Sequence, residues 1–183
     1  MKGRVFVVSG VALAAMCASQ LVWKYGVASS EEALFAPVVA FVDRHTISLL
    51  CAHVEAILEG FSSGEFMRVG DTFYFCGGGF VRITSGCTGT KQLFHFLVLM
   101  ITSLSGGGFG RKVGFILFGA ILLQNFNMLR ISLLCFFVQV FPTHWSFFHT
   151  TIFRFAFYVV LFLLWIFWEE VCSSLKNNSD DYS

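Results

Sequence analysis

The sequence has few charged residues and few prolines, and these shortages exclude an ordinary water-soluble domain. Charged residues make up 13% of the 183 residues and there are two prolines, whereas 56% of the residues are hydrophobic and 24 are Phe. A soluble core of this size cannot bury so much apolar surface. We therefore expect an integral membrane protein that contacts membrane lipid.

Clusters of basic residues and closely spaced cysteine pairs are also absent. The twelve Lys and Arg are scattered and the net charge is +1, so a nucleic-acid partner is not expected. The six cysteines contain no CxxC pair, which excludes a disulfide framework and disfavours a quinone-linked thiol oxidoreductase, because that chemistry needs a pair able to form a disulfide. Most of these cysteines are expected to be inert buried thiols.

Long apolar runs predict four membrane-spanning helices, at residues 5–23, 89–104, 113–141 and 145–168. The first run could also be the apolar region of a signal peptide, but its length favours a helix. By the positive-inside rule, Arg111 and Lys112, in a glycine-rich turn, mark the cytoplasmic side together with the N-terminus and a polar tail at 169–183. A fifth span within 33–61 would place Lys2 and Arg4 outside, so we prefer four.

Two segments are predicted not to cross the membrane. In 33–61, the polar residues at 43–45 end a short apolar stretch, and apolar residues from Ile47 onward recur at three-and-four spacing, as in an interfacial amphipathic helix. In 66–84, alternating residues, a Gly70-Asp71 turn and a glycine break predict two or three short strands. The expected fold is an all-α polytopic membrane bundle of one domain, 1–183, with an interfacial helix and a small extracytoplasmic β-insert.

Arg130 is the charged residue that the apolar pattern explains least. It lies deep in the third predicted span, where a guanidinium facing lipid would cost several kcal/mol. Gln124, Asn127 and Arg130 follow at three-residue intervals and share one broad helix face, so a polar stripe is directed into the bundle. An ionisable group at this depth indicates function; the alternative is a packing network between helices.

Cys87 immediately precedes the second predicted span. The partial positive charge at a helix N-terminus favours a thiolate, which is the nucleophilic form of cysteine. The amides of Thr88 and Gly89 could stabilise a developing oxyanion, and Gly89 would let a substrate backbone approach closely. The alternative is an unreactive cysteine in a turn.

His149 is the candidate general base, because it lies one turn into the last span at a depth that matches Cys87. His95 competes for this role, but two turns of helix separate it from Cys87 by about 12 Å, too far for direct proton transfer. A metal site made of Cys87, His144 and His149 has a poor histidine spacing for one helix face. We therefore expect no metal and no cofactor.

These residues resemble a known family, the exosortase/archaeosortase membrane transpeptidases. That family carries a Cys followed by a small polar residue and Gly, then Asn-x-x-Arg, then His. The corresponding residues here are Cys87-Thr88-Gly89, Asn127-Met128-Leu129-Arg130 and His149, and the resemblance covers about residues 43–168. Lys91 occupies a position where many members have Arg.

The resemblance implies a membrane-embedded cysteine protease or transpeptidase. Cys87 would be the nucleophile, and Arg130 and His149 would complete the catalytic site. Its substrates would be exported proteins whose C-terminal sorting signal consists of a short motif, a membrane helix and a basic cluster. The acyl group held on the enzyme would pass to an acceptor amine, and the enzyme would lie in a bacterial inner membrane with its site facing outside the cytoplasm.

One different class of function remains open at this point. A non-catalytic polytopic membrane protein, such as a channel, a transporter subunit or an assembly factor, would also place Gln124, Asn127 and Arg130 along a polar path. The reactivity of the Cys87 thiol separates the two interpretations.

Overall fold

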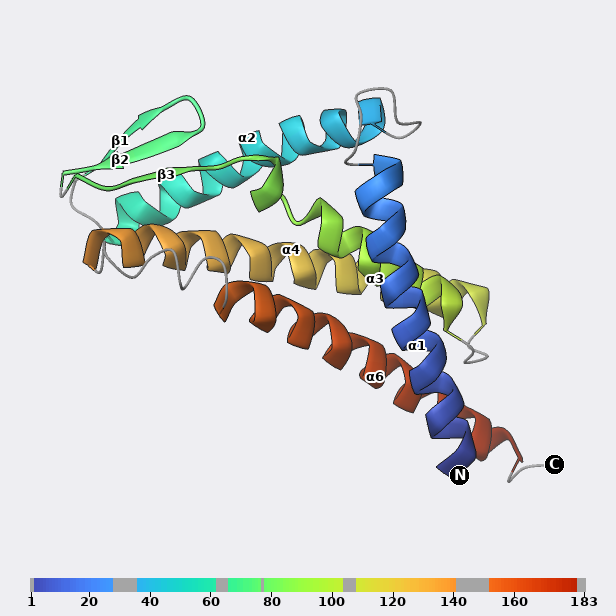
Figure 1. The fold of residues 1–183 in the computed structure, drawn as a ribbon. Coiled ribbons are helices and arrows are strands. Elements are labelled where there is room, and N and C mark those ends of the chain that lie inside the picture. The colour runs from blue at the N-terminus through green and yellow to red at the C-terminus, as the bar shows by residue number, and fades with distance from the viewer. Residues whose placement is uncertain are drawn as a thin grey trace.

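The computed structural model describes residues 2–27, 36–61, 66–76, 78–103, 108–140 and 152–180. This part of the chain is mostly helical and includes one small antiparallel sheet (Figure 1). The α-helices are α1 (Lys2–Val22), α2 (Ala36–Phe61), α3 (Thr90–Thr102), α4 (Phe109–Val140) and α6 (Phe153–Asp180). A π-helical turn, η1 (Trp23–Val27), extends α1.

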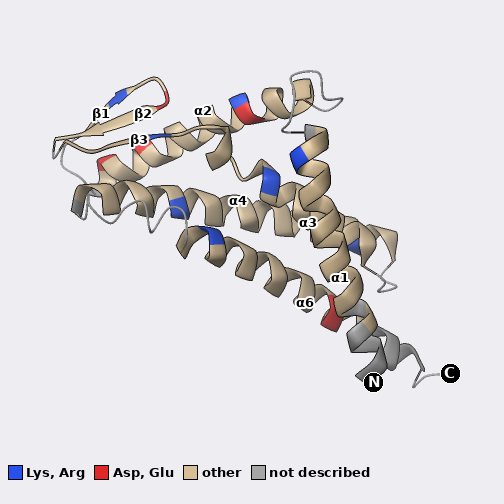
Figure 2. Ribbon diagram, in the orientation of Figure 1, with Lys and Arg blue, Asp and Glu red and all other residues tan. Residues whose placement is uncertain are grey.

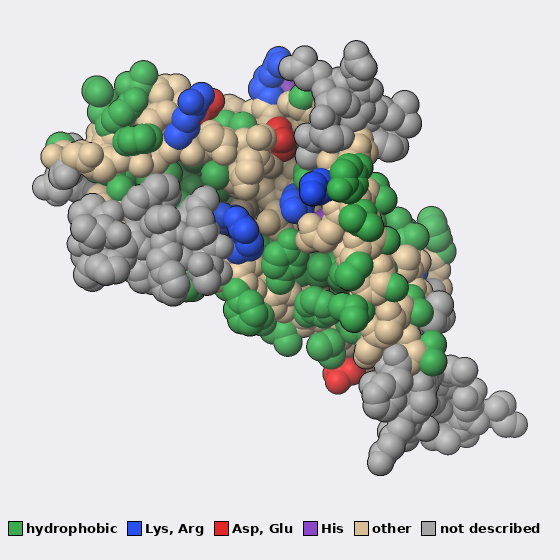
Figure 3. Space-filling view, in the orientation of Figure 1, with side chains coloured by type: hydrophobic (Ala, Val, Ile, Leu, Met, Phe, Trp, Pro, Cys, Tyr) green, Lys and Arg blue, Asp and Glu red, His purple; other side chains and the backbone are tan. Residues whose placement is uncertain are grey.

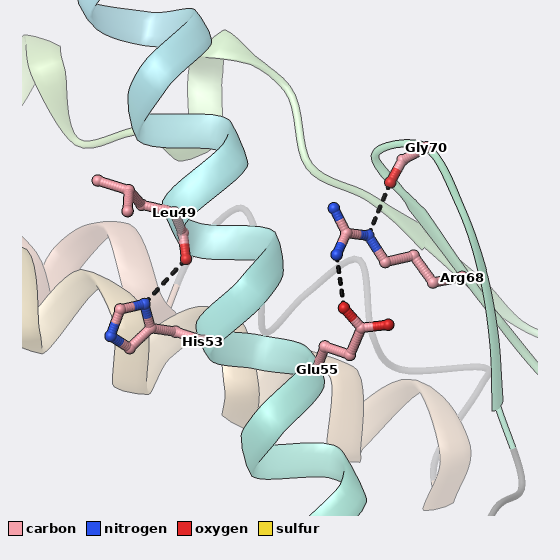
Figure 4. Close-up of polar contacts among 5 residues, drawn as sticks. All are labelled: Leu49, His53, Glu55, Arg68 and Gly70. Atoms are coloured by element: carbon pink, nitrogen blue, oxygen red, sulfur yellow. Dashed lines mark hydrogen bonds and ion pairs between the residues drawn. The ribbon is translucent and has the colours of Figure 1, made fainter.

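The predicted β-insert is present as three strands, β1 (Phe66–Val69), β2 (Thr72–Phe75) and β3 (Phe80–Arg82), in the order β1-β2-β3. Gly70 has a φ of 61° in the tight turn between β1 and β2, a backbone conformation that glycine adopts without steric cost. Arg68 of β1 forms an ion pair with Glu55 of α2 and also donates to the carbonyl of Gly70 (Figure 4). The sheet is thereby attached to α2.

Two apolar cores hold the molecule together. The sheet-side core joins α2, the inner face of the sheet and the C-terminal half of α4, and includes Leu50, Phe73 and Leu134. The helix-side core joins α1, α3, α6 and the N-terminal half of α4, and includes Phe96 and Leu161. Figure 1 shows α4 running alongside both α2 and α6, so this helix belongs to both cores.

Two helices, α4 and α6, are long and apolar enough to cross a membrane among the described residues. Charged positions are few along their length (Figure 2). The predicted span at 89–104 corresponds to α3, which has 13 residues and is therefore about 20 Å long, less than the hydrocarbon thickness of about 30 Å. The four-span count remains a prediction.

Three boundaries differ from those expected. First, α2 is one helix of 26 residues that continues through the polar residues at 43–45, where Asp43 accepts hydrogen bonds from Thr88 and Thr90. Second, Arg111 and Lys112 lie in the first turn of α4 and not in the preceding turn. Third, the segment expected to be a tail continues α6 as far as Asp180.

Candidate functional site

Cys87 lies in a short, structured connection between the sheet and α3. It ends the 3₁₀ turn η2 (Ser85–Cys87), and its amide donates to the Thr84 carbonyl at 2.8 Å. Two residues later, Gly89 has a φ of 77° and caps the N-terminus of α3. A side chain at position 89 would be strained, so the sequence requires glycine here for the backbone turn that leads into the helix.

Asp43 of α2 fixes this connection from one side. Its Oδ1 atom accepts hydrogen bonds from the hydroxyl of Thr88 at 2.7 Å and from the hydroxyl of Thr90 at 2.6 Å. The two threonines flank Gly89, and Thr88 is 1% exposed. One carboxylate oxygen therefore holds both sides of the turn that follows the cysteine.

The polar stripe of α4, which the three-residue spacing predicts, fixes the connection from the other side. Asn127 is fully buried, and its Nδ2 atom donates to the carbonyl oxygen of Cys87 at 2.7 Å. A Cβ atom at Gly89 would lie 3.3 Å from Asn127 Nδ2 and 3.5 Å from Gln124 Oε1. The stripe is therefore packed against the Cys87–Gly89 connection, and glycine also permits this close approach.

Cys87 and Arg130 both line a cavity of about 970 Å³ between the sheet, α3, α4 and α6. The apolar part of the lining comes largely from β3 and the C-terminal half of α4. Four basic residues also line this cavity, and among the described lining residues there is no Asp or Glu; the basic residues are Arg82, Lys91, Arg130 and Arg154. Figure 3 shows basic side chains gathered near the middle of this face. The cavity is therefore electropositive and favours a negatively charged group.

Arg130 is 7% exposed, so it lies in the protein interior, as the polar stripe predicts. Its Nη1 atom makes a long hydrogen bond of 3.5 Å to Asn127 Oδ1, and its Nε atom has no hydrogen-bond partner among the described residues. Burying a guanidinium N–H without a partner costs free energy. An anionic ligand or a developing oxyanion in the cavity would relieve that cost.

The structure brings together six of the seven residues predicted for the site. Cys87, Arg130 and Lys91 line the cavity, Asn127 joins Cys87 to Arg130, and Thr88 and Gly89 shape the connection. The seventh, His149, lies outside the described residues, as does His144. The described residues contain no group of His, Cys, Asp and Glu suited to a metal ion.

One detail of the predicted chemistry changes, and one agrees with the expectation. The amide of Thr88 already donates to the Ser85 carbonyl at 3.3 Å, so it is not a free donor for an oxyanion in this conformation. The competing histidine, His95, is fully buried and packs beside Phe94 and Tyr158, and it does not line the cavity. Its two ring nitrogens have no partner among the described residues.

Asp43 was not predicted from the sequence to belong to the site. The signal was present, because a carboxylate within an otherwise apolar stretch needs a polar partner. That partner lies more than forty residues away in the sequence, in Thr88 and Thr90. Only the packing of α2 beside η2 and α3 identifies it.

Comparison with known proteins does not assign the chain to a family. No protein-family model matches the chain, and neither a curated protein nor a solved structure does so.

Proposed function

We propose that this chain is a membrane-embedded cysteine protease or transpeptidase that cleaves the C-terminal sorting signal of exported proteins, as the resemblance to exosortases and archaeosortases implies. The observation that carries the proposal is the shared cavity. It is lined by Cys87, Arg130 and Lys91, and the carbonyl of Cys87 is held by Asn127 from the same helix as Arg130. A nucleophile beside buried, uncompensated positive charge suits acyl transfer.

In the proposed reaction, His149 takes the proton of the Cys87 thiol, the sulfur attacks a peptide carbonyl carbon and the carbonyl oxygen gains negative charge. Arg130 stabilises that charge from the wall of the cavity. The C–N bond then breaks, and the leaving amine takes a proton from His149, so that a thioester remains on Cys87. An acceptor amine then attacks the thioester and forms a new amide as the C–S bond breaks. The proton that the amine loses passes to His149 and from there to the departing thiolate of Cys87.

The proposed topology has four spans in a bacterial inner membrane, with an extracytoplasmic site. The lengths and compositions of α4 and α6 support two of these spans. Arg111 and Lys112, in the first turn of α4, would lie at the cytoplasmic surface, which places the C-terminal half of α4, with Arg130, toward the outside. To test this orientation, single cysteines are introduced at exposed positions on either side of the proposed membrane. Only those on the outer side should react with a membrane-impermeant maleimide added to intact cells.

The test of function is Cys87→Ala, expressed in cells together with exported proteins that end in a short motif, a membrane helix and a basic cluster. We expect processing of their C-termini to stop while the variant remains in the membrane. Cys76→Ala is the matched control, because Cys76 is exposed in a turn and does not line the cavity. Mass spectrometry of the substrate termini gives the readout, and unchanged trimming in the Cys87→Ala strain would remove the enzyme interpretation.

The non-catalytic alternative predicts an open polar path along α4. Asn127 is 0% exposed and the stripe is packed against the Cys87–Gly89 connection, which does not favour such a path. Arg130→Lys separates the two interpretations further. A catalytic guanidinium held in fixed geometry loses most of its effect in this variant, whereas a charge that only lines a path is largely preserved.

A further inference from the structure

The third strand has one unpaired edge among the described residues. β3 is the last strand in the order β1-β2-β3, and its register pairs Val81 with Phe73 of β2. The hydrogen bonds that flank this pair are Phe75 N to Gly79 O and Ile83 N to Asp71 O, both at 2.9 Å. Odd-numbered residues of this segment therefore direct their backbone groups toward β2.

It follows that Phe80 and Arg82 direct their N–H and C=O groups away from the sheet. In an antiparallel ladder, successive residues of an edge strand alternate between the paired side and the free side. A free edge of this kind presents a ready-made template for an added strand. Phe80 is 60% exposed, whereas Gly79, just before the strand, is packed against Val138 of α4.

The electropositive cavity lies along this free edge. Its lining includes the continuous segment 78–84, whereas no residue of β1 or β2 contributes. The opposite wall comes from α4 and α6. The same segment leads directly into η2. Cys87 therefore lines the cavity a few residues after β3. The volume of about 970 Å³ is at the top of the range of roughly 300–1,000 Å³ that small-molecule sites occupy.

From this arrangement we infer that the substrate is bound as an extended peptide that adds a strand to the free edge of β3 and thereby presents its scissile carbonyl to Cys87. The inference rests on the proposed function and specifies how the substrate is recognised. Main-chain hydrogen bonds to Phe80 and Arg82 provide affinity, and alternate side chains of the peptide enter the cavity. Recognition by backbone groups is tolerant of sequence along the strand.

The test uses the full-length protein and two probes that both alkylate a thiol by losing chloride from a carbon next to a carbonyl. One is a pool of hexapeptides with mixed side chains and a C-terminal chloromethyl ketone, and the other is 2-chloroacetamide. Modification of Cys87 is followed by mass spectrometry of its peptide. The rate for the peptide pool divided by the rate for chloroacetamide measures peptide recognition separately from the intrinsic reactivity of the thiol.

The diagnostic variant is Arg82→Pro, with Arg82→Ala as its matched control. Proline removes the N–H that points to the free edge and leaves the hydrogen bonds of the odd-numbered residues to β2 in place, and proline is tolerated on an edge strand. Both variants lose the guanidinium. We expect the rate ratio to fall about 5- to 10-fold in Arg82→Pro relative to Arg82→Ala, as for the loss of one hydrogen bond.

A second measurement needs no change in the protein. Peptide probes N-methylated at one amide at a time should lose labelling of Cys87 at every second position, because alternate amides of a strand face β3. Equal labelling of Arg82→Pro and Arg82→Ala, or N-methyl effects without a two-residue period, would overturn strand addition. Neither result would affect the processing test with Cys87→Ala, so failure of strand addition is distinguishable from failure of the proposed function.

Discussion

Replacing Asp43 with alanine tests whether α2 positions the cysteine. The variant removes the single oxygen that accepts hydrogen bonds from Thr88 at 2.7 Å and Thr90 at 2.6 Å. A hydrogen bond to a charged group contributes about 1.5–3 kcal/mol. The hydroxyl of Thr88 also lies 2.8 Å from the Ser85 carbonyl and from the hydroxyl of Thr90, so neither threonine loses every partner. We therefore expect a total loss of about 1.5–3 kcal/mol for both bonds together.

Two assays measure this loss. For a chain of this length, 1 kcal/mol shifts Tm by about 2–4 °C, so Asp43→Ala should lower the Tm of the detergent-solubilised protein by about 3–12 °C. If the same free energy positions Cys87 for reaction, substrate processing should slow by about 10- to 150-fold. Asp43→Asn is the control, because its amide oxygen can still accept both hydroxyl hydrogens, and it should retain most of the stability and activity.

The reasoning fails if Asp43→Ala and Asp43→Asn behave alike. It also fails if Asp43→Ala melts within about 1 °C of the unaltered protein, since the two hydrogen bonds would then contribute almost nothing. A fall in Tm without a change in processing would restrict Asp43 to a structural role.

Three further predictions concern single positions. Gly89→Ala should cost about 1–2 kcal/mol from its φ of 77°, and its Cβ would press on Asn127 at 3.3 Å, so both Tm and processing should fall; an unchanged processing rate would contradict the link from Asn127 to Cys87. Gly119→Ala would place a Cβ 2.4 Å from the ring of buried Phe96, so we expect the free energy of unfolding to fall by about 1–3 kcal/mol. The double variant with Phe96→Leu, whose smaller side chain leaves room for the Cβ, should regain part of this loss. Burial raises the pKa of the Cys51 thiol, so at pH 8 a smaller fraction is thiolate and iodoacetamide should modify Cys51 more slowly than exposed Cys76; equal rates by peptide mass spectrometry would show that Cys51 is accessible.

Part of the candidate site could be predicted because its residues follow a helical or local pattern. The three-residue spacing of Gln124, Asn127 and Arg130 fixes them to one face of any helix that contains them, and the cost of a charge in lipid directs that face inward. The structure places Asn127 and Arg130 in the protein interior, as expected. The turn signals at Gly70 and at the glycines after β2 likewise predicted the strands correctly, because positive φ is a local property.

Other features could not be predicted because they depend on which surfaces meet. The length of α3 was overestimated, since apolar composition does not distinguish a short helix buried between neighbours from one that spans the membrane. The amphipathic helix expected from Ile47 begins earlier, at Ala36, and continues through residues 43–45, because the Asp43 carboxylate is hydrogen-bonded by two threonines from another segment.

The sequence by itself determined that the protein is apolar and mostly helical, with a small β-insert, and that Cys87 precedes the start of a helix. These features depend on composition and periodicity, which are properties of short stretches of the chain. Only the tertiary structure decided that α2 holds the cysteine connection through Asp43, that Cys87 and Arg130 share one electropositive cavity, and that the free edge of β3 borders it. These relations join segments far apart in the chain. They arise from the packing of two apolar cores against α4, which no local pattern encodes.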